Sequence, residues 1–141
     1  MPRIRIELPE KLPFSTTIPV RVTDLNYGNH LGNHALLGLM HEARMQYLAS
    51  LGATELCFFG VALIMSDSAI EYKGEAFFGD QLQFEVGAAE ISRVGFELYY
   101  RVTKDAGKTL IALAKTGMVC FNYDARKVVA VPEEAKTALV G

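Results

Sequence analysis

The stretch that decides the fold runs from Arg21 to Gly52 and reads RVTDLNYGNHLGNHALLGLMHEARMQYLASLG. Its first part is polar and contains glycine, and at Asn33 it changes to a regular apolar pattern that continues to about Leu51. The apolar residues recur at spacings of four, three and four, at Leu36, Met40, Ala43 and Tyr47. This period predicts one long helix, with Asn33 as its N-cap and Gly52 as its terminating glycine. Because the helix is apolar around most of its girth, we expect other elements to wrap it.

The chain on either side of this helix has the alternating pattern of β-strands. The predicted strands are 18–23, 61–73, 81–88, 96–103 and 109–123. A turn at 104–108 joins the last two as a hairpin. The first 17 residues contain three prolines and predict an irregular arm or an edge strand, and residues 132–141 form a C-terminal tail. One helix followed by local antiparallel hairpins predicts the α+β class, with the sheet covering the helix, in a single domain over residues 1–141.

The last predicted strand is apolar on both of its faces. One face carries Leu110, Ala112, Ala114 and Met118, and the other carries Ile111, Leu113, Val119 and Phe121. A single-layer sheet over one helix cannot bury both faces by itself. We therefore expect the protein to associate with itself through sheet faces or edges.

The composition excludes several classes of protein. Half of the 141 residues are apolar, and 14 basic residues against 16 acidic ones leave a net charge of -2, which argues against a nucleic-acid partner. Cys57 and Cys120 lack the spacing of a zinc site and indicate a reducing compartment. The longest apolar run, 56–65, is shorter than the roughly 20 residues of a membrane helix, and the N-terminus lacks the apolar segment of a signal peptide. We expect a cytoplasmic protein with no membrane partner.

The polar segment from Asp24 to Asn33 carries the densest cluster of groups suited to chemistry. A strand end, a glycine-containing loop and the start of the helix meet there, so unpaired backbone N–H groups and the positive end of the helix dipole point to one place. Such a place binds a carboxylate or a phosphate, or stabilises an oxyanion that forms at a carbonyl. The alternative is that Asp24 and Asn26 only shape a turn and that Asn33 only caps the helix.

The loop, the helix and the later strands also carry a set of spaced motifs. In and after the loop these are Asp24, His30, Asn33, Glu42, Ala43, Arg44, Leu51 and Gly52. Further along they are Ala76, Gly79, Asp80 and the segment 118–132. Together they resemble the 4-hydroxybenzoyl-CoA thioesterase-like branch of the hot-dog superfamily, whose pattern is approximately D-x-D-x-x-G-H-x-x-N followed by a helix with E-x-A-R and a final L-G. The resemblance covers Ile18 to Pro132 and is specific because several motifs agree in order and spacing.

This resemblance implies a hot-dog fold, in which a curved antiparallel sheet of about five strands wraps one long central helix. It also implies a homodimer, often a homotetramer of two dimers. The implied substrates are acyl-CoA or acyl-carrier-protein thioesters, with no cofactor other than the coenzyme A of the substrate. In such enzymes a backbone N–H at the helix start polarises the thioester carbonyl, and a carboxylate attacks it or activates water. The resemblance therefore predicts a thioesterase.

One departure from the family pattern bears on catalysis. The second carboxylate of D-x-D is the catalytic one, and this chain has Asn26 there. An amide is neither a general base at neutral pH nor a carboxylate nucleophile, although it can hold a water or a thioester oxygen. Asp24 and Glu42 remain as candidate carboxylates, and the alternative for Glu42 is an ion pair with Arg44 or another surface residue. The alternatives to a thioesterase are a protein that binds acyl-CoA without hydrolysing it and a hot-dog dehydratase.

The other candidate site residues form groups by chemistry. The loop and oxyanion group is Tyr27, Gly28, Asn29, His30 and Asn33, and Asn29 replaces a glycine of the family pattern. The substrate-binding group is Asp67, Lys73 and Arg93, with Lys104 and Lys115 as further cations for the phosphates of coenzyme A. Asp67 is alternatively a solvent-facing strand residue. The aromatic residues that line an acyl pocket, or simply belong to the core, are Phe58, Phe59, Tyr72, Phe77 and Phe78. His30, His34 and His41 follow no metal-ligand pattern, so we predict no metal.

Overall fold

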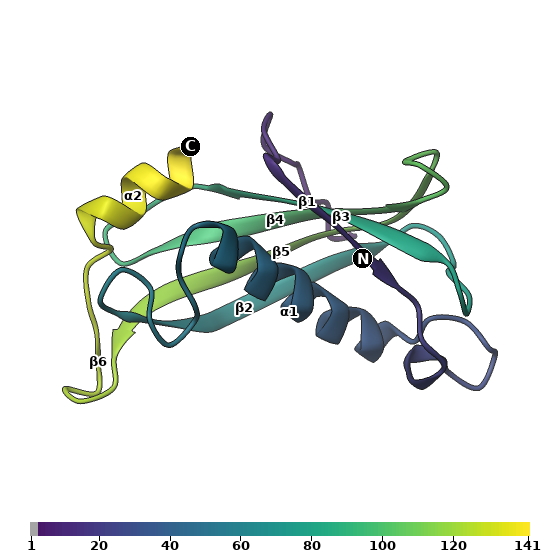
Figure 1. Cartoon of the computed structure of the whole chain (residues 1–141), viewed down its shortest axis with the longest axis horizontal. Coiled ribbons are helices and arrows are strands. Elements are labelled where there is room, and N and C mark those ends of the chain that lie inside the picture. The colour runs from purple at the N-terminus through teal and green to yellow at the C-terminus, as the bar shows by residue number, and fades with distance from the viewer. Residues whose placement is uncertain (1–2) are drawn as a thin grey trace.

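One long helix lies across an antiparallel sheet (Figure 1). The computed structural model describes residues 3–141. The helical elements are α1 (Asn33–Ser50), α2 (Glu133–Val140) and a 3₁₀ turn at Val22–Asp24. The strands are β1 (Phe14–Pro19), β2 (Ala62–Tyr72), β3 (Gln81–Ala89), β4 (Gly95–Lys104), β5 (Thr109–Asn122) and β6 (Lys127–Val128). They pair antiparallel in the order β1-β3-β4-β5-β2, with β6 on β5. This architecture confirms the predicted α+β class.

The core lies between α1 and the face of the sheet that it covers. All the residues of the predicted helical period are buried: Leu36, Met40, Ala43 and Tyr47. They belong to one cluster with buried residues of β3 and β4, among them Phe84, Leu98 and Tyr100. Gly52 follows the helix with a φ of 77°, which confirms its place as the terminating glycine. The predicted N-cap is wrong by one residue, because Gly32 is the cap and Asn33 is already helical.

The beginning of the chain differs from the prediction. The first strand is Phe14–Pro19 and not 18–23, because the chain turns at Val22–Asp24, where the Asp24 carboxylate accepts a hydrogen bond from the Arg21 N–H. Pro19 ends an edge strand, where its missing N–H is tolerated. Of the first 17 residues, 1–2 lie outside the described residues, 3–13 form an arm without helix or strand, and 14–17 belong to the edge strand β1.

This arm crosses the face of the sheet opposite α1. A Cβ on Gly87 of β3 would lie 2.6 Å from the carbonyl oxygen of Lys11, so only glycine allows the arm to pass this closely. Closer to the N-terminus, Ile6 is buried and its N–H donates to the carboxylate of Glu71 on β2 at 2.6 Å. The arm therefore covers part of the outer face that one sheet layer would leave exposed.

The predicted C-terminal tail folds as a helix. In α2, Ala135 and Leu139 are buried and belong to the same core as α1. Figure 1 shows α2 at one end of the sheet, and α1 begins at the other end. Buried residues four positions apart are typical of a helix, but one such pair in a short segment does not predict a helix from the sequence.

A bulge breaks the predicted alternation of β5. Val102 of β4 pairs with Ala112, and Thr103 pairs with Leu110, so Ile111 is an extra residue on β5. The prediction that Ile111 faces away from Ala112 is wrong, since both residues are buried in the same core. The other three residues predicted on the second face, Leu113, Val119 and Phe121, are only partly exposed.

No helix within residues 3–141 is both long enough and apolar enough to pass through a bilayer.

Candidate functional site

The loop before α1 is anchored by Asp24. The carboxylate accepts three hydrogen bonds from Arg21, one from the backbone N–H at 2.8 Å and two from the guanidinium at 3.1 and 3.2 Å. The Asp24 carbonyl accepts a further bond from the N–H of Gly32 at 2.9 Å, which closes the loop. Burial raises the pKa of Asp24, but the bonds and the charge of Arg21 outweigh it, so this pKa lies below its ordinary value. Asp24 is thus a paired, weakly basic carboxylate that shapes the loop.

Asn26 organises the middle of the loop. Its side-chain oxygen accepts hydrogen bonds from the backbone N–H of Gly28 at 2.9 Å and from that of His30 at 3.3 Å. The backbone N–H of Asn26 donates to the His30 carbonyl at 2.8 Å. The side-chain oxygen is therefore occupied, and the NH₂ group is left to donate. Tyr27 is fully exposed at the tip of the loop.

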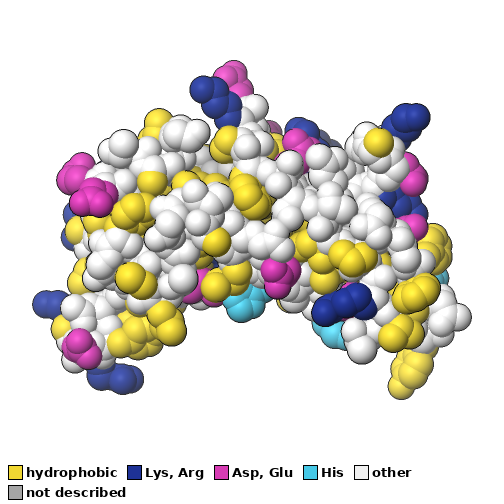
Figure 2. Space-filling model, in the orientation of Figure 1, with side chains coloured by type: hydrophobic (Ala, Val, Ile, Leu, Met, Phe, Trp, Pro, Cys, Tyr) yellow, Lys and Arg dark blue, Asp and Glu magenta, His cyan; other side chains and the backbone are white. Residues whose placement is uncertain are grey.

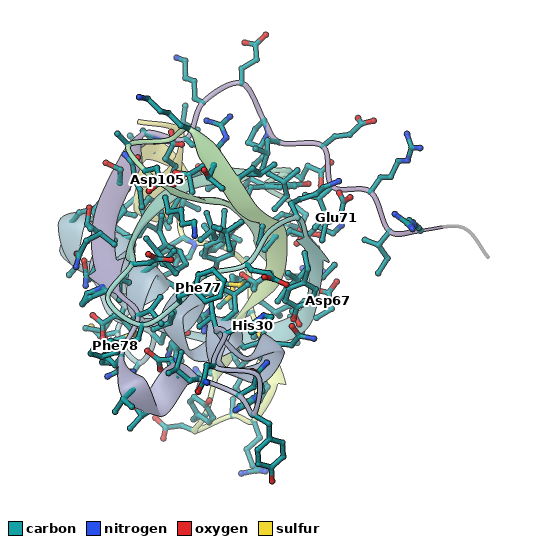
Figure 3. All side chains as sticks on the ribbon, turned by 90° about the vertical axis from the view of Figure 1, so that its right-hand side faces the viewer. His30, Asp67, Glu71, Phe77, Phe78 and Asp105 are labelled. Atoms are coloured by element: carbon teal, nitrogen blue, oxygen red, sulfur yellow. The ribbon has the colours of Figure 1, made fainter. Side chains whose placement is uncertain are left out.

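Backbone pairing joins this loop to the connection between β2 and β3. The N–H of Leu31 donates to the carbonyl of Ala76 at 2.8 Å, and His30 forms an isolated bridge with Phe77. The pairing places the Glu75 carboxylate 3.4 Å from Nδ1 of His30. Figure 3 shows His30 and Phe77 together on the end of the molecule, and their ring centroids are 5.5 Å apart.

A cavity of about 230 Å³ opens at this junction. Its apolar wall is Leu31, Leu36, Ala76 and Ile111, and its polar groups come from Asn26, His30, Asn33, Tyr72 and Glu75. Gly74 also lines it, and a Cβ there would lie 2.7 Å from the Leu110 carbonyl oxygen. Figure 2 shows hydrophobic side chains around this end of the molecule. Three large hydrophobic side chains are exposed here, Tyr27 from the loop before α1 and Phe77 and Phe78 from the connection between β2 and β3.

The start of α1 faces this cavity without a cap. Gly32 offers no side chain to the first amides, and its own N–H is already bound to Asp24. Within residues 3–141 the N–H of Asn33 has no hydrogen-bond acceptor. The hydroxyl of Tyr72 donates to the Asn33 carbonyl at 3.2 Å and so fixes the end of β2 beside the helix start. An uncapped helix start at a cavity is an anion-binding arrangement.

Glu42 lies away from the cavity. It is exposed on α1, and its carboxylate accepts a hydrogen bond from the Gln46 side chain at 2.8 Å. The alternative of an ion pair between Glu42 and Arg44 is wrong, because Arg44 is buried and points to the other side. Arg44 donates to Glu55 at 3.0 Å and to the hydroxyl of Tyr100 at 3.3 Å.

The three predicted substrate-binding residues do not come together within one chain. Lys73 directly precedes the cavity residue Gly74, and its ammonium lies 3.1 Å from the Glu71 carboxylate. Asp67 is exposed on β2, its carboxylate accepts from the Ser66 hydroxyl at 2.8 Å, and it does not line the cavity. Arg93 lies near the start of α2 at the opposite end of the sheet, since its carbonyl accepts from the N–H of Val131.

The remaining candidates separate by environment. Of the aromatic residues, Phe58 is completely buried in the core, and Phe77, Phe78 and Tyr72 are exposed near the cavity. Lys104 and Lys115 are paired with Asp80 and Glu97. The three histidines are apart, with His41 paired with Glu55 and His30 with Glu75, and residues 3–141 contain no cluster of three potential metal ligands.

Glu75 is a candidate residue that the sequence did not single out. It directly precedes Ala76, which belongs to the motifs that resemble the family. A carboxylate next to a motif residue was the feature of the sequence that could have indicated it. The role of Glu75 depends on the backbone pairing of residues 30–31 with residues 76–77, which cannot be seen in the sequence.

Comparison with known proteins decides the family. A family model described as the thioesterase-like superfamily matches residues 20–139. The chain belongs to this superfamily. A relative named 1,4-dihydroxy-2-naphthoyl-CoA hydrolase, from Microcystis aeruginosa, is 33% identical over 104 residues, which are 72% of this chain and 74% of that protein. The predictions of a thioesterase family and of a thioester hydrolase are confirmed, and binding without hydrolysis is not favoured.

Solved structures share the fold of this superfamily member. A 1,4-dihydroxy-2-naphthoyl-CoA thioesterase from Synechocystis has a TM-score of 0.81 at 23% identity, over 90% of this chain and 95% of that chain. A probable thioesterase from Escherichia coli has a TM-score of 0.74 at 22% identity, over 89% and 95%. A Staphylococcus aureus protein solved in complex with CoA has a TM-score of 0.79 at 19% identity, over 90% and 81%. The predicted hot-dog fold is confirmed.

Proposed function

We propose that this protein hydrolyses an acyl-CoA thioester in the cavity at the start of α1. The observation that carries the proposal is the uncapped helix start, where Gly32 and Asn33 line the cavity and the Asn33 N–H has no acceptor within residues 3–141. When water attacks a thioester carbonyl placed there, the negative charge on oxygen develops against this N–H and the positive end of the helix dipole. Collapse of the intermediate then releases the thiol. The reaction uses water and no cofactor apart from the coenzyme A of the substrate.

The loop residues hold this arrangement in place. Asn26 binds the N–H groups of Gly28 and His30, so its free NH₂ group is positioned to donate to a water or to the thioester. Asn29 has a φ of 63°, in the left-handed region that asparagine tolerates better than most residues, so it can replace the glycine of the family pattern. Asp24 fixes the loop from its buried side. Of the two predicted carboxylates, neither Asp24 nor Glu42 lines the cavity.

An aromatic acyl group is the substrate class that we favour. The relative from Microcystis aeruginosa is named for a naphthoyl-CoA, and the cavity has an apolar wall of Leu31, Leu36, Ala76 and Ile111. Lys73 adjoins the cavity and is the cation that we assign to the phosphates of coenzyme A. A finer assignment to the 4-hydroxybenzoyl-CoA branch is part of the same proposal, as is a cytoplasmic location, where acyl-CoA is found.

We also propose a homodimer that pairs through β2, with a tetramer as the next level of assembly. β2 is an edge strand that carries the exposed side chain of Met65 and ends at Tyr72 of the cavity. An unpaired edge is a template for a second strand. A partner strand along this edge would bring residues of the second subunit beside the cavity, which is the route by which Arg93 or Asp67 could reach a substrate.

The test is a panel of acyl-CoA substrates with release of free thiol as the readout. The panel contains 4-hydroxybenzoyl-CoA, 1,4-dihydroxy-2-naphthoyl-CoA, and short and medium alkanoyl-CoA thioesters. We expect hydrolysis, with the aromatic thioesters giving the highest kcat/KM. Saturable binding of the whole panel without thiol release would instead establish a non-hydrolytic binding protein.

A further inference from the structure

Neither of the two candidate carboxylates, Asp24 and Glu42, nor Asn26 supplies a general base in the cavity. Both carboxylate oxygens of Asp24 accept hydrogen bonds from Arg21. Asn26 carries an amide, which has no basic lone pair at neutral pH. Glu42 is exposed on another part of α1 and outside the cavity. Among the cavity-lining residues, the two titratable side chains that meet each other are His30 and Glu75.

We propose that His30 is the general base of the hydrolysis and that Glu75 is the positioning residue that orients its ring. This inference rests on the proposed thioesterase function and assigns the residues that activate the water. The two side chains come from segments 45 residues apart in the sequence, and the backbone pairing of Leu31 with Ala76 holds them together.

The geometry leaves one ring nitrogen of His30 available. Nδ1 lies 3.4 Å from the Glu75 carboxylate, so the side of the ring that carries Nδ1 faces Glu75, and we assign Nε2 as the basic nitrogen. A Cβ on Gly28 would lie 3.2 Å from Nε2, so the glycine keeps the space beside this atom open. The Phe77 ring packs against the imidazole at a centroid distance of 5.5 Å and limits its rotation.

The other charged groups near His30 are already paired. Lys104 lies over the Phe77 ring at 5.1 Å, and its ammonium is 3.0 Å from the Asp80 carboxylate. Arg21 is bound to Asp24 on the far side of the loop. Glu75 is therefore the carboxylate that faces the imidazole, and it stabilises the imidazolium that forms during the reaction.

The step balances with water as the only co-reactant. Water oxygen forms a bond to the thioester carbon while Nε2 of His30 takes one proton, and the carbonyl electron pair moves to the oxygen held by the N–H of Asn33. The pair then returns, the C–S bond breaks, and Nε2 gives its proton to the leaving sulfur. The products are the carboxylic acid and the free thiol, and the imidazole is neutral again.

The experiment compares wild type with His30→Gln, Glu75→Gln and Glu75→Asp on the best substrate of the panel. His30→Gln is expected to lower kcat about 10²-fold or more, with KM within about twofold, because Gln accepts no proton. Glu75→Gln is expected to lower kcat about tenfold, since a half-exposed pair contributes modestly, and Glu75→Asp recovers part of the loss. Glu134→Gln, an exposed carboxylate on α2, is the matched control and leaves kcat unchanged.

The separation of kcat from KM and the conservative variant distinguish this role from a structural one. Glu75→Gln is expected to lower kcat and leave KM within about twofold, and recovery by Glu75→Asp shows that a carboxylate is needed beside the imidazole. Wild-type turnover with an unchanged kcat in Glu75→Gln or in His30→Gln overturns the proposal. Both results leave the thioesterase assignment intact, which only the absence of wild-type thiol release overturns.

Discussion

At the scale of single residues, asparagine occupies two positions where the family pattern has other residues, and the structure explains both in terms of hydrogen bonding and backbone angle. Asn29 replaces a glycine and has a positive φ of 63°. Asn26 replaces a carboxylate, and its oxygen accepts the two N–H groups that a carboxylate at this position would accept. The shape of the loop therefore survives both changes, and what changes is the chemistry at position 26.

The first prediction concerns Asn26→Asp. An aspartate accepts the same bonds from Gly28 and His30 and adds an ionised oxygen at the cavity, so we expect the fold to be unchanged and thioester hydrolysis to be equal to or faster than that of wild type. Thiol release measured with the same acyl-CoA panel checks this. If the rate is abolished while the circular dichroism spectrum stays that of wild type, the amide NH₂ itself is needed for the reaction.

The second prediction concerns the stability that Asp24 contributes. In the folded protein the pKa of Asp24 lies below its ordinary value of 3.8 because of Arg21, despite the opposing effect of burial. The ionised carboxylate therefore stabilises the fold above pH 3.8, and this contribution is lost as the pH falls through the folded-state pKa. Asp24→Ala should lower the free energy of unfolding at neutral pH by about 1 kcal/mol, as the loss of a capping residue does.

Urea denaturation at neutral and acidic pH measures this effect. The difference between wild type and Asp24→Ala should shrink as the pH is lowered below 3.8. Asp24→Asn serves as the control, because it keeps an acceptor for the Arg21 N–H and should lose less stability at neutral pH. A difference that is independent of pH would show that the charge of Asp24 plays no part.

At the scale of elements, α1 has a regular apolar period but no capping side chain at its N-terminus. Its buried residues hold it against the sheet, so the helix does not depend on a capping side chain. The cap position is Gly32, and the amide of Asn33 stays free. A helix start that is left unsatisfied in this way is available for the oxygen of a substrate.

The third prediction follows from that free helix start. Gly32→Asp would supply a carboxylate to cap the helix, and this carboxylate would occupy the amides that we assign to the thioester oxygen. We expect a gain in stability of only a few tenths of a kcal/mol and a loss of kcat of about 10²-fold. Gly32 has a φ of -72°, which any residue adopts, and a Cβ there would lie 3.0 Å from the exposed His34 ring, which can move.

Gly38→Ala is the matched control within the same helix. Gly38 is exposed on α1, and a Cβ there would meet no atom within 4 Å. Replacing it with alanine should raise the free energy of unfolding by about 1 kcal/mol through helix propensity and leave hydrolysis unchanged. Activity that is retained in Gly32→Asp would contradict the assignment of the helix start as the oxyanion site.

At the scale of the whole molecule, different segments cover the two faces of the sheet, and strands of different length form its two edges. α1 covers one face, and the N-terminal arm crosses the other, where Ile6 reaches Glu71 on β2. One edge is the short strand β1, and the other is the longer strand β2. The longer edge, which ends at the cavity, is the surface that we assign to the dimer.

The fourth prediction is the assembly state. In multi-angle light scattering the protein should have two or four times the 15.5 kDa mass of one chain. Met65→Lys places a charge on the β2 edge and should shift the protein toward the monomer, because lysine on an edge opposes strand pairing. Val128→Lys, an equally exposed change on β6, is the control and should leave the mass unchanged. A wild-type monomer at all concentrations would contradict the proposed dimer.

The sequence by itself determined the elements whose signals are local. The period of α1, the glycine at position 52, the strands from β2 to β5 and the hairpin at 104–108 were all predicted within one or two residues. In these segments each buried position is specified by neighbours a few residues away, and that regularity is visible in the sequence. The family pattern extended this to the position of the loop at the helix start.

Only the tertiary structure decided which distant groups meet. Ile111 joins the core because a bulge shifts β5 against β4, and Arg44 binds Glu55 because the chain after α1 folds back over it. His30 meets Glu75 because the backbone of the loop pairs with the connection after β2. Such contacts depend on register and packing between segments far apart in the chain, and no periodicity within one segment encodes them.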